Sequence, residues 1–95
     1  MRSGKWLIFV SPQNAQAVLL KVWRDHQQGR LGIGVKLHNG AVICVYTYDW
    51  KDVEDITRVE YRLRAIGITG VMPYKTDEAT MADRYGKGVS TYISR

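Results

Sequence analysis

The amino-acid sequence predicts a single α+β domain, residues 1–95, in which a two-layer, mainly antiparallel sheet carries both helices on one face. Three observations predict this fold class. Residues 41–48 are apolar on both faces of a strand, residues 53–66 repeat apolar side chains at helical spacing, and Asn39-Gly40 is a strong hairpin signal. In chain order the elements form a β-α-β-β-α-β pattern, the split βαβ arrangement. Because crossover connections are right-handed, both helices are expected on one face, and the opposite face of the sheet stays open.

The composition limits the classes of protein to which the chain can belong. Its hydrophobic content of 45% and charged content of 24% are ordinary for a globular domain. No apolar run approaches the ~20 residues of a membrane span, and the single cysteine, Cys44, cannot form an intramolecular disulfide. We therefore expect a cytoplasmic protein that does not bind membranes. The net charge of +5 favours anionic partners such as nucleic acid, nucleotides or phosphorylated peptides.

The N-terminal third of the chain predicts a strand followed by a helix. Residues 5–10 are a short run of strand-forming residues, and Ser11-Pro12 is typical of a helix start with serine as the N-cap. The helix is expected over residues 12–28, where Gly29 would end it. Its buried stripe is expected to comprise Ala15, Val18, Leu19, Val22 and His26, with Gln16, Lys21, Arg24 and Asp25 off the stripe.

The middle of the chain predicts a hairpin. Residues 33–38 alternate, and the sets that face opposite ways are Ile33, Val35 and Leu37 on one side and Gly34, Lys36 and His38 on the other. The turn at Asn39-Gly40 would be of type I′, which needs positive φ at both residues. The returning strand, residues 41–48, has no polar face, so we expect it in the interior of the sheet.

The second half of the chain predicts another helix and two more strands. Asp49 is a good N-cap and Gly67 a good stop, and the buried stripe between them is expected to comprise Val53, Ile56, Val59 or Glu60, Leu63 and Ile66. The solvated face is expected to carry Arg58, Arg62 and Arg64, two of them paired with Glu54 and Glu60. Residues 69–74 predict a fourth strand with Pro73 at a sheet edge, residues 76–85 a short turn or helix, and residues 89–93 a final edge strand.

The candidate functional residues are expected on the open face of the sheet. Lys36 and His38 belong there because their neighbours Val35 and Leu37 need the core. The further candidates are Tyr46 and Tyr48 on the returning strand, Lys75 after the fourth strand, and Arg84 in the C-terminal loop. Such a face suits an anionic ligand, since rings stack on bases and cations neutralise phosphate. The alternative is a polar face that is simply solvated.

The remaining chemistry-bearing residues are expected to be structural. Cys44 lies on an interior strand with no base beside it, so we expect a core residue and not a nucleophile. His26 is expected to be partly buried with its hydrogen bonds satisfied. Two histidines and one cysteine far apart in the sequence give no metal-ligand spacing, so neither a metal nor a cofactor is expected. Of the three tryptophans, Trp50 beside the helix start is expected to be the one that is partly exposed.

Several motifs resemble those of the basophilic-leukaemia-expressed protein family. They are Gly29-Arg30-Leu31-Gly32, Lys36, residues 42–49 (VICVYTYD), residues 54–59 (EDITRV) and Tyr74-Lys75-Thr76-Asp77, and together they cover roughly residues 29–92. The resemblance implies a fold like that of the cap-binding translation initiation factor 4E, a curved antiparallel sheet backed by helices. The two tryptophans with which that factor holds its ligand cannot be assigned to tryptophans of this chain.

The same resemblance implies an enzymatic alternative, because members of this family are often described as phosphothreonine lyase domains. Lyases of this kind use a lysine to abstract a proton and a histidine to protonate the leaving phosphate, and Lys36-Leu37-His38 is similar in spacing. Lys75 and Arg84 would then hold the phosphate. Three functions stay open: a module that binds an anionic ligand (nucleotide, RNA or phosphorylated peptide), a phospho-residue lyase, and an interaction domain that forms a homodimer through its open face or edge strand.

Overall fold

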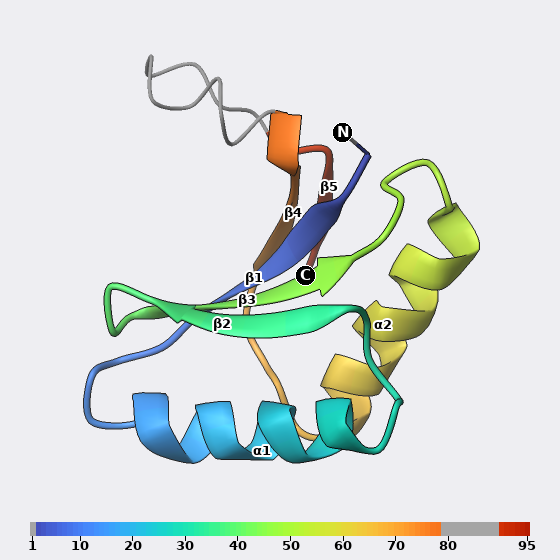
Figure 1. The fold of residues 1–95 in the computed structure, drawn as a ribbon. Coiled ribbons are helices and arrows are strands. Elements are labelled where there is room, and N and C mark those ends of the chain that lie inside the picture. Colours follow the sequence, from blue (N-terminus) through green and yellow to red (C-terminus); the bar gives the residue numbers. More distant parts are fainter. Residues whose placement is uncertain (1, 79–89) are drawn as a thin grey trace.

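A five-stranded sheet and two helices make up the computed structural model, which describes residues 2–78 and 90–95 (Figure 1). In chain order the elements are β1 (Gly4–Phe9), α1 (Ala15–Gln27), β2 (Gly34–His38), β3 (Val42–Thr47), α2 (Val53–Ala65), β4 (Met72–Thr76) and β5 (Tyr92–Ser94). The strands are arranged in the order β2-β3-β1-β4-β5, and every neighbouring pair is antiparallel. The predicted β-α-β-β-α-β order with a further edge strand is confirmed.

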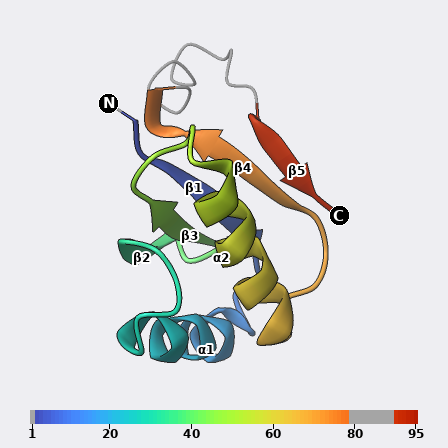
Figure 2. The ribbon, with the colours of Figure 1, turned by 90° about the vertical axis from the view of Figure 1, so that its right-hand side faces the viewer.

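Both helices pack on the same face of the sheet (Figures 1 and 2). The connections β1–α1–β2 and β3–α2–β4 each join parallel strands with one antiparallel strand between them, which is the predicted split βαβ arrangement. Side chains from both helices and from the sheet form one buried cluster, which comprises Trp6, Ile8, Val22, Leu31, Ile43, Val45, Ile56, Val59, Leu63, Ile68, Met72 and Tyr74. The opposite face of the sheet therefore points away from both helices.

The strand register decides which side chains reach the core. Trp6 of β1 lies opposite Val45 of β3 and Tyr74 of β4, and all three are buried beneath the helices. Residues that alternate with them point to the other side of the sheet. Lys36 and His38 consequently lie on the open face, as predicted.

The hairpin between β2 and β3 follows the sequence closely. Asn39 and Gly40 have φ values of 51° and 68°, as the predicted turn requires. Strand β3 lies between β2 and β1, so its interior position is also confirmed. Ile33 was expected at the start of the strand, on the same face as Val35 and Leu37, but it precedes the strand and is exposed. Its N–H donates to the carbonyl of Tyr46 (2.9 Å), and the paired ladder starts only at Gly34.

Helix α1 begins three residues later than predicted. Ser11 does not cap it. The carbonyl of Ser11 instead accepts from the Asn14 N–H (3.0 Å) and closes a turn that contains Pro12. Asn14 takes the N-cap position without a side-chain hydrogen bond.

Helix α2 also begins three residues later than predicted, with Asp52 as its N-cap in place of Asp49. The Asp52 carboxylate accepts from the N–H of Asp55 (3.2 Å). Asp49 is used elsewhere, since it accepts from the N–H of Lys51 (2.9 Å) and binds Arg2 (2.9 Å). These contacts lower the pKa of Asp49, mainly through the hydrogen bond from Arg2.

Two predictions, one about α1 and one about α2, are wrong because of one interhelical ion pair. Asp25 was expected on the solvated side, yet its carboxylate is buried and accepts two hydrogen bonds from Arg62 of α2 (3.0 and 2.8 Å). Arg30 lies 3.6 Å from the same carboxylate. Arg62, in turn, is not part of a solvated face. His26 is partly buried as expected, but its buried Nδ1 has no hydrogen-bond partner among the described residues, whereas a histidine with its hydrogen bonds satisfied was predicted.

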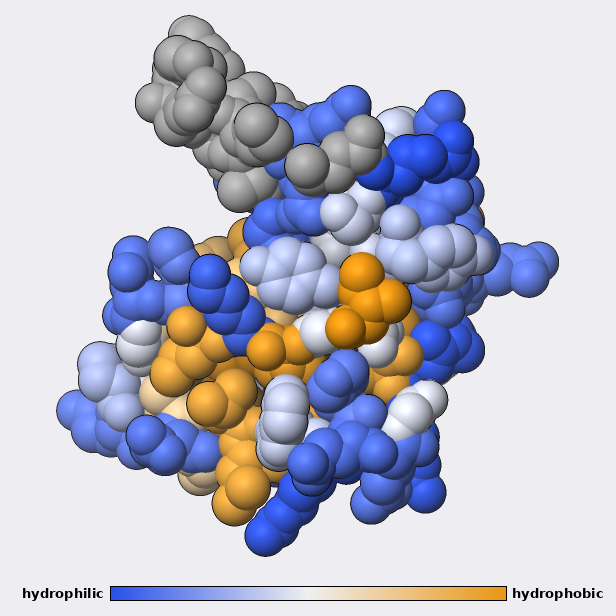
Figure 3. All heavy atoms as spheres, viewed as in Figure 1, coloured by the Kyte–Doolittle hydropathy of each residue, from blue (hydrophilic) through white to orange (hydrophobic). Residues whose placement is uncertain are grey.

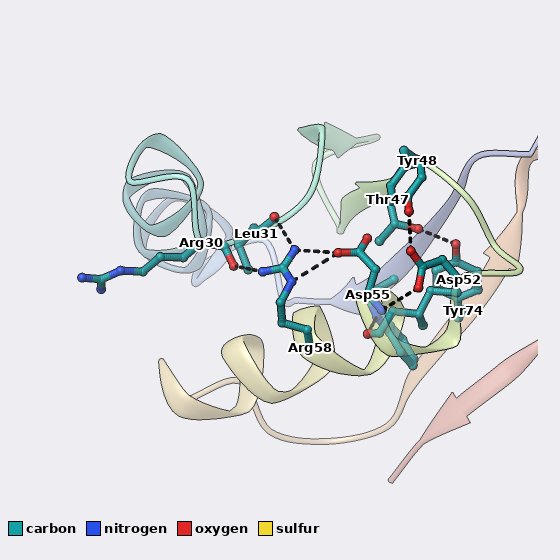
Figure 4. A network of polar contacts seen from close by, with 10 residues as sticks. Arg30, Leu31, Thr47, Tyr48, Asp52, Asp55, Arg58 and Tyr74 are labelled. Atoms are coloured by element: carbon teal, nitrogen blue, oxygen red, sulfur yellow. Dashed lines mark hydrogen bonds and ion pairs between the residues drawn. The ribbon is translucent and has the colours of Figure 1, made fainter.

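The other two arginines of α2 also hold neighbouring segments in place, although Arg58 is exposed as the predicted solvated face requires. Arg58 donates to the carbonyl oxygens of residues 30 and 31 and to Asp55 (Figure 4). Arg64 donates to the carbonyl of Ile68 and to the hydroxyl of Ser94 in β5. These hydrogen bonds do not go to Glu54 and Glu60, the partners that the sequence spacing predicted.

The C-terminal strands are shifted relative to the prediction. Strand β4 runs from Met72 to Thr76 and is interior, with β1 on one side and β5 on the other. Pro73 is therefore not at a sheet edge; it pairs with Ile93 of β5, beyond the last β1 pair at Tyr74. The predicted edge strand is present as β5.

Trp50 is partly exposed as expected, but Trp23 is also exposed, which the sequence did not predict. Trp23 on α1 is 42% exposed, whereas Trp50 is half-buried in the turn before α2. Trp6 is buried, and its indole N–H donates to the carbonyl of Ile56 (3.1 Å).

Candidate functional site

The candidate residues lie on the open face in rows that run across the strands. One row contains Gly34 of β2, Tyr46 of β3, Lys5 of β1 and Lys75 of β4. The next row contains Lys36, Cys44 and Leu7, and a third contains His38, Val42 and Phe9. Successive rows are about 7 Å apart, because side chains on one face of a strand repeat every two residues. Lys36, His38, Tyr46 and Lys75 thus share one surface, as the sequence predicted.

Tyr46 is the aromatic side chain at the centre of the first row. On one side the Nζ of Lys5 lies 5.6 Å from the ring centroid. On the other side Gly34 has no side chain, and a methyl group there would lie 3.9 Å from Tyr46 Cδ2, an ordinary contact. Burial raises the pKa of Tyr46, and nearby Cys44 adds to this effect. The phenol therefore stays neutral at physiological pH.

Lys5 is a member of this surface that the sequence did not single out. It is buried, and its ammonium group lies 2.7 Å from a carboxylate oxygen of Asp77, to which the hydroxyl of Ser3 also donates. Burial alone would raise the pKa of Asp77, but the hydrogen bonds from Lys5 and Ser3 outweigh it and keep this pKa below its ordinary value. Asp77 is thus an anion that holds Lys5 beneath the ring of Tyr46.

An apolar strip on β1 was also missed. Phe9 is 61% exposed on the open face, and Leu7 lies two residues before it on the same side. The alternation of Lys5, Leu7 and Phe9 with Gly4, Trp6 and Ile8 is the sequence signal for this strip, and the prediction of a short strand over residues 5–10 does not use it. The third row ends at His38, whose Nε2 accepts from the side-chain amide of Asn39 (3.1 Å).

Tyr48 does not join this surface. It follows the last residue of β3, and its hydroxyl donates to the carboxylate of Asp52 at the start of α2 (Figure 4). This hydrogen bond raises the pKa of Tyr48. Arg84, the other predicted phosphate ligand, lies outside the described residues.

The geometry bears only partly on the lyase alternative. Lys36 and His38 are exposed side chains two residues apart on the same face, so the structure brings together the pair that proton abstraction and leaving-group protonation would need. A lysine base is usually buried, since desolvation favours the neutral amine. Among residues 2–78 and 90–95, the rows on the open face contain no arginine to hold a phosphate.

Cys44 is buried among its open-face neighbours and does not belong to the core cluster. Burial raises the pKa of its thiol, which disfavours the reactive thiolate. Within the part of the chain that the structure describes, no three histidine, cysteine or acidic side chains are grouped to hold a metal ion. Neither described helix is long and apolar enough to cross a membrane.

A protein-family model described as basophilic leukemia-expressed protein Bles03 matches residues 1–81, and the chain belongs to this family. The resemblance expected from the motifs is thereby confirmed. The match also includes β1 and α1, which precede the first of those motifs at Gly29. Both strands that flank Tyr46, together with Tyr46 itself, therefore lie within the family match.

Proposed function

We propose that this member of the Bles03 family binds single-stranded RNA across the open face of its sheet, with Tyr46 stacking on a base. The observation that best supports this proposal is the row in which the Tyr46 ring lies between Gly34 and Lys5, with Lys75 beyond. An aromatic ring stacks on any base, and the exposed Lys36 in the next row neutralises phosphate, whereas the charge of the buried Lys5 is already paired with Asp77. Neither interaction requires a deep pocket, so both suit the face of a sheet.

A second aromatic side chain supports the same ligand. Phe9 lies on β1 and Tyr46 on β3, and these are adjacent central strands of a β-α-β-β-α-β sheet. RNA-recognition modules with this strand connectivity stack two or three bases on aromatic residues of the sheet. The similarity to these modules is one of strand connectivity, and the exposed Phe9 ring supports the same mode of binding.

The distribution of cations favours RNA over a phosphorylated peptide. Recognition of a phosphorylated side chain relies on arginines that bind the phosphate in a bidentate manner. Arg58 and Arg62 are already bound to Asp55 and Asp25 on the helix side of the molecule. The open face carries lysines and aromatic rings, which suit a chain of phosphates and bases.

The proposal is tested by fluorescence anisotropy with a labelled single-stranded RNA of about eight nucleotides, a length typical of such sites. Tyr46→Leu keeps an apolar side chain but removes the ring. Loss of one stacked base costs about 1–3 kcal/mol, so the dissociation constant should rise roughly five- to 150-fold. Tyr61→Leu is the matched control, since Tyr61 is exposed on α2, away from the open face, and this variant should bind as the wild type does.

The phosphate contacts are tested through the salt dependence of binding. Lys36→Ala should lower the slope of log affinity against log salt by about 0.7, the value for one phosphate contact on a single strand. Lys51→Ala, next to Trp50 before α2, should leave the slope unchanged. Equal affinity of the wild type and the Tyr46 variant would overturn the proposal. So would amide shifts on the open face with a phosphothreonine peptide but not with RNA.

A further inference from the structure

An apolar groove runs between α1 and β2 at one edge of the sheet. It has a volume of about 340 Å³ and is lined by Gln16, Leu19, Leu20, Trp23, Val35 and Leu37. Leu20 is 48% exposed and Trp23 42% exposed, although large apolar side chains on a helix usually face the core. Figure 3 shows hydrophobic surface over β2 and α1, with the groove side of the molecule toward the viewer. Contiguous exposed apolar surface of this kind marks an interaction site.

The strand beside the groove is open to a further strand. Among the described strands, β2 pairs only with β3, so the backbone groups on its outer side face away from the sheet. An extended chain paired with this edge would direct alternate side chains to the two faces of the sheet. One set would enter the groove above Leu20 and Trp23, and the other would lie beside Lys36 on the open face.

Charge decides which chain fits this edge. Lys36 is the central residue of β2, and Arg24 lies one helical turn after Leu20 on α1. The acid of α1, Asp25, is already bound by Arg62. Two β2 strands paired antiparallel about their centres would place one Lys36 next to the other, and like charges opposite one another destabilise a sheet. An acidic chain meets no such repulsion.

We propose that the edge formed by α1 and β2 is a docking site for an extended peptide that alternates apolar and acidic residues. The peptide adds a strand beside β2, places its apolar side chains in the groove, and pairs a carboxylate with Lys36. Backbone hydrogen bonds to the edge give affinity, and the groove and Lys36 give specificity. The site shares Lys36 with the proposed RNA surface but lies outside the Tyr46 row, so peptide binding does not require RNA binding.

The test uses a short synthetic peptide of alternating leucine and glutamate, followed by calorimetry and by amide shifts of the labelled protein. Binding should shift amides of β2 and of the Leu20–Trp23 side of α1. Leu20→Glu should weaken binding at least about tenfold, because it puts a like charge against the peptide and removes apolar contact. Val53→Glu is the matched control, since Val53 on α2 was expected in the buried stripe but is 54% exposed, close to the 48% of Leu20. A peptide N-methylated at alternate amides should not bind, because it lacks the donors that pair with the edge.

Charge reversal gives the sharpest discrimination. Lys36→Glu should reduce affinity for the leucine–glutamate peptide and raise affinity for its leucine–lysine counterpart. The Lys36→Glu and Leu20→Glu proteins should both keep the circular dichroism spectrum of the wild type. The proposal is overturned if the peptide does not bind, if a scrambled peptide of the same composition binds as well, or if N-methylation has no effect. A dimer seen by light scattering, and dissociated by Leu20→Glu but not by the peptide, would assign the groove to a second copy of the chain.

Discussion

The hydrogen bond between Thr47 and Tyr74 offers a quantitative test of how the core face of the sheet is held. Thr47 Oγ1 and Tyr74 Oη lie 2.6 Å apart, and both side chains are completely buried (Figure 4). Tyr74→Phe leaves the threonine hydroxyl without this partner, and Thr47→Val does the same to the tyrosine hydroxyl. A buried hydroxyl that loses its partner costs about 1–3 kcal/mol. Each single variant should therefore lower the free energy of unfolding by about that amount.

The double variant should behave differently from the sum of the two single variants. Replacing both partners with apolar groups of similar shape is nearly neutral, because no unpaired hydroxyl remains in the core. We therefore expect the Thr47→Val, Tyr74→Phe double variant to be close to the wild type, with a coupling energy of about 2–6 kcal/mol, equal in size to the sum of the two single losses. Urea unfolding followed by circular dichroism gives the four free energies of the cycle.

The control is Tyr61→Phe, which removes a hydroxyl from a ring exposed on α2 and should leave the free energy of unfolding unchanged. If the double variant lost the sum of the two single effects, the two hydroxyls would not depend on each other. That result would refute the reasoning, since the cost would then arise from packing alone.

Three further predictions concern the same core and the open face. Gly4→Ala should be strongly destabilising in thermal unfolding, because a Cβ at Gly4 would lie 2.3 Å from the Tyr74 hydroxyl; Gly34→Ala, where a Cβ would make an ordinary contact 3.9 Å from the Tyr46 ring, is the comparison. Burial raises the pKa of Tyr74 to about 12. The stability that this neutral phenol contributes should therefore be complete below the ordinary tyrosine pKa of about 10 and lost as the pH rises toward 12. A free energy of unfolding that does not change over this pH range in the wild type would contradict the prediction, and Tyr74→Phe should remove the change. The wild-type protein should not eliminate phosphate from a phosphothreonine peptide, because Lys36 is exposed; a mass loss that vanishes in both Lys36→Ala and His38→Ala would establish the lyase instead.

The fold could be predicted because its signals are local in sequence. The alternation of Val35 and Leu37 with Lys36 and His38 assigned both faces of β2 correctly, since period-two patterning depends only on neighbours. The start of α2 could not be assigned in this way. Asp49 and Asp52 are both good N-caps, and the choice depends on Arg2, which binds Asp49 from 47 positions away.

The partners of the α2 arginines escaped prediction for the same reason. Arg62 has its carboxylate partner in Asp25, 37 positions away, while sequence spacing can only propose partners one turn along the helix. On the candidate site, the pair Lys36 and Tyr46 was predicted, but Lys5 was not. Its place beneath the Tyr46 ring follows from the pairing of β1 with β3, and pairing between strands distant in sequence is a tertiary property.

The two proposed sites meet at Lys36, and this predicts a partial antagonism between their ligands. Lys36 lies on β2 next to the row of Tyr46, where RNA is proposed to bind, and it is also the residue that pairs with a carboxylate of the docked peptide. A saturating leucine–glutamate peptide should therefore weaken RNA binding about as much as Lys36→Ala does, and it should lower the salt slope by the same ~0.7. In the Lys36→Ala protein the peptide should have no further effect on RNA. By linkage, RNA must weaken peptide binding by the same factor. Complete displacement of RNA by the peptide would contradict this account, because the Tyr46 row is not covered by a strand added at the far side of β2.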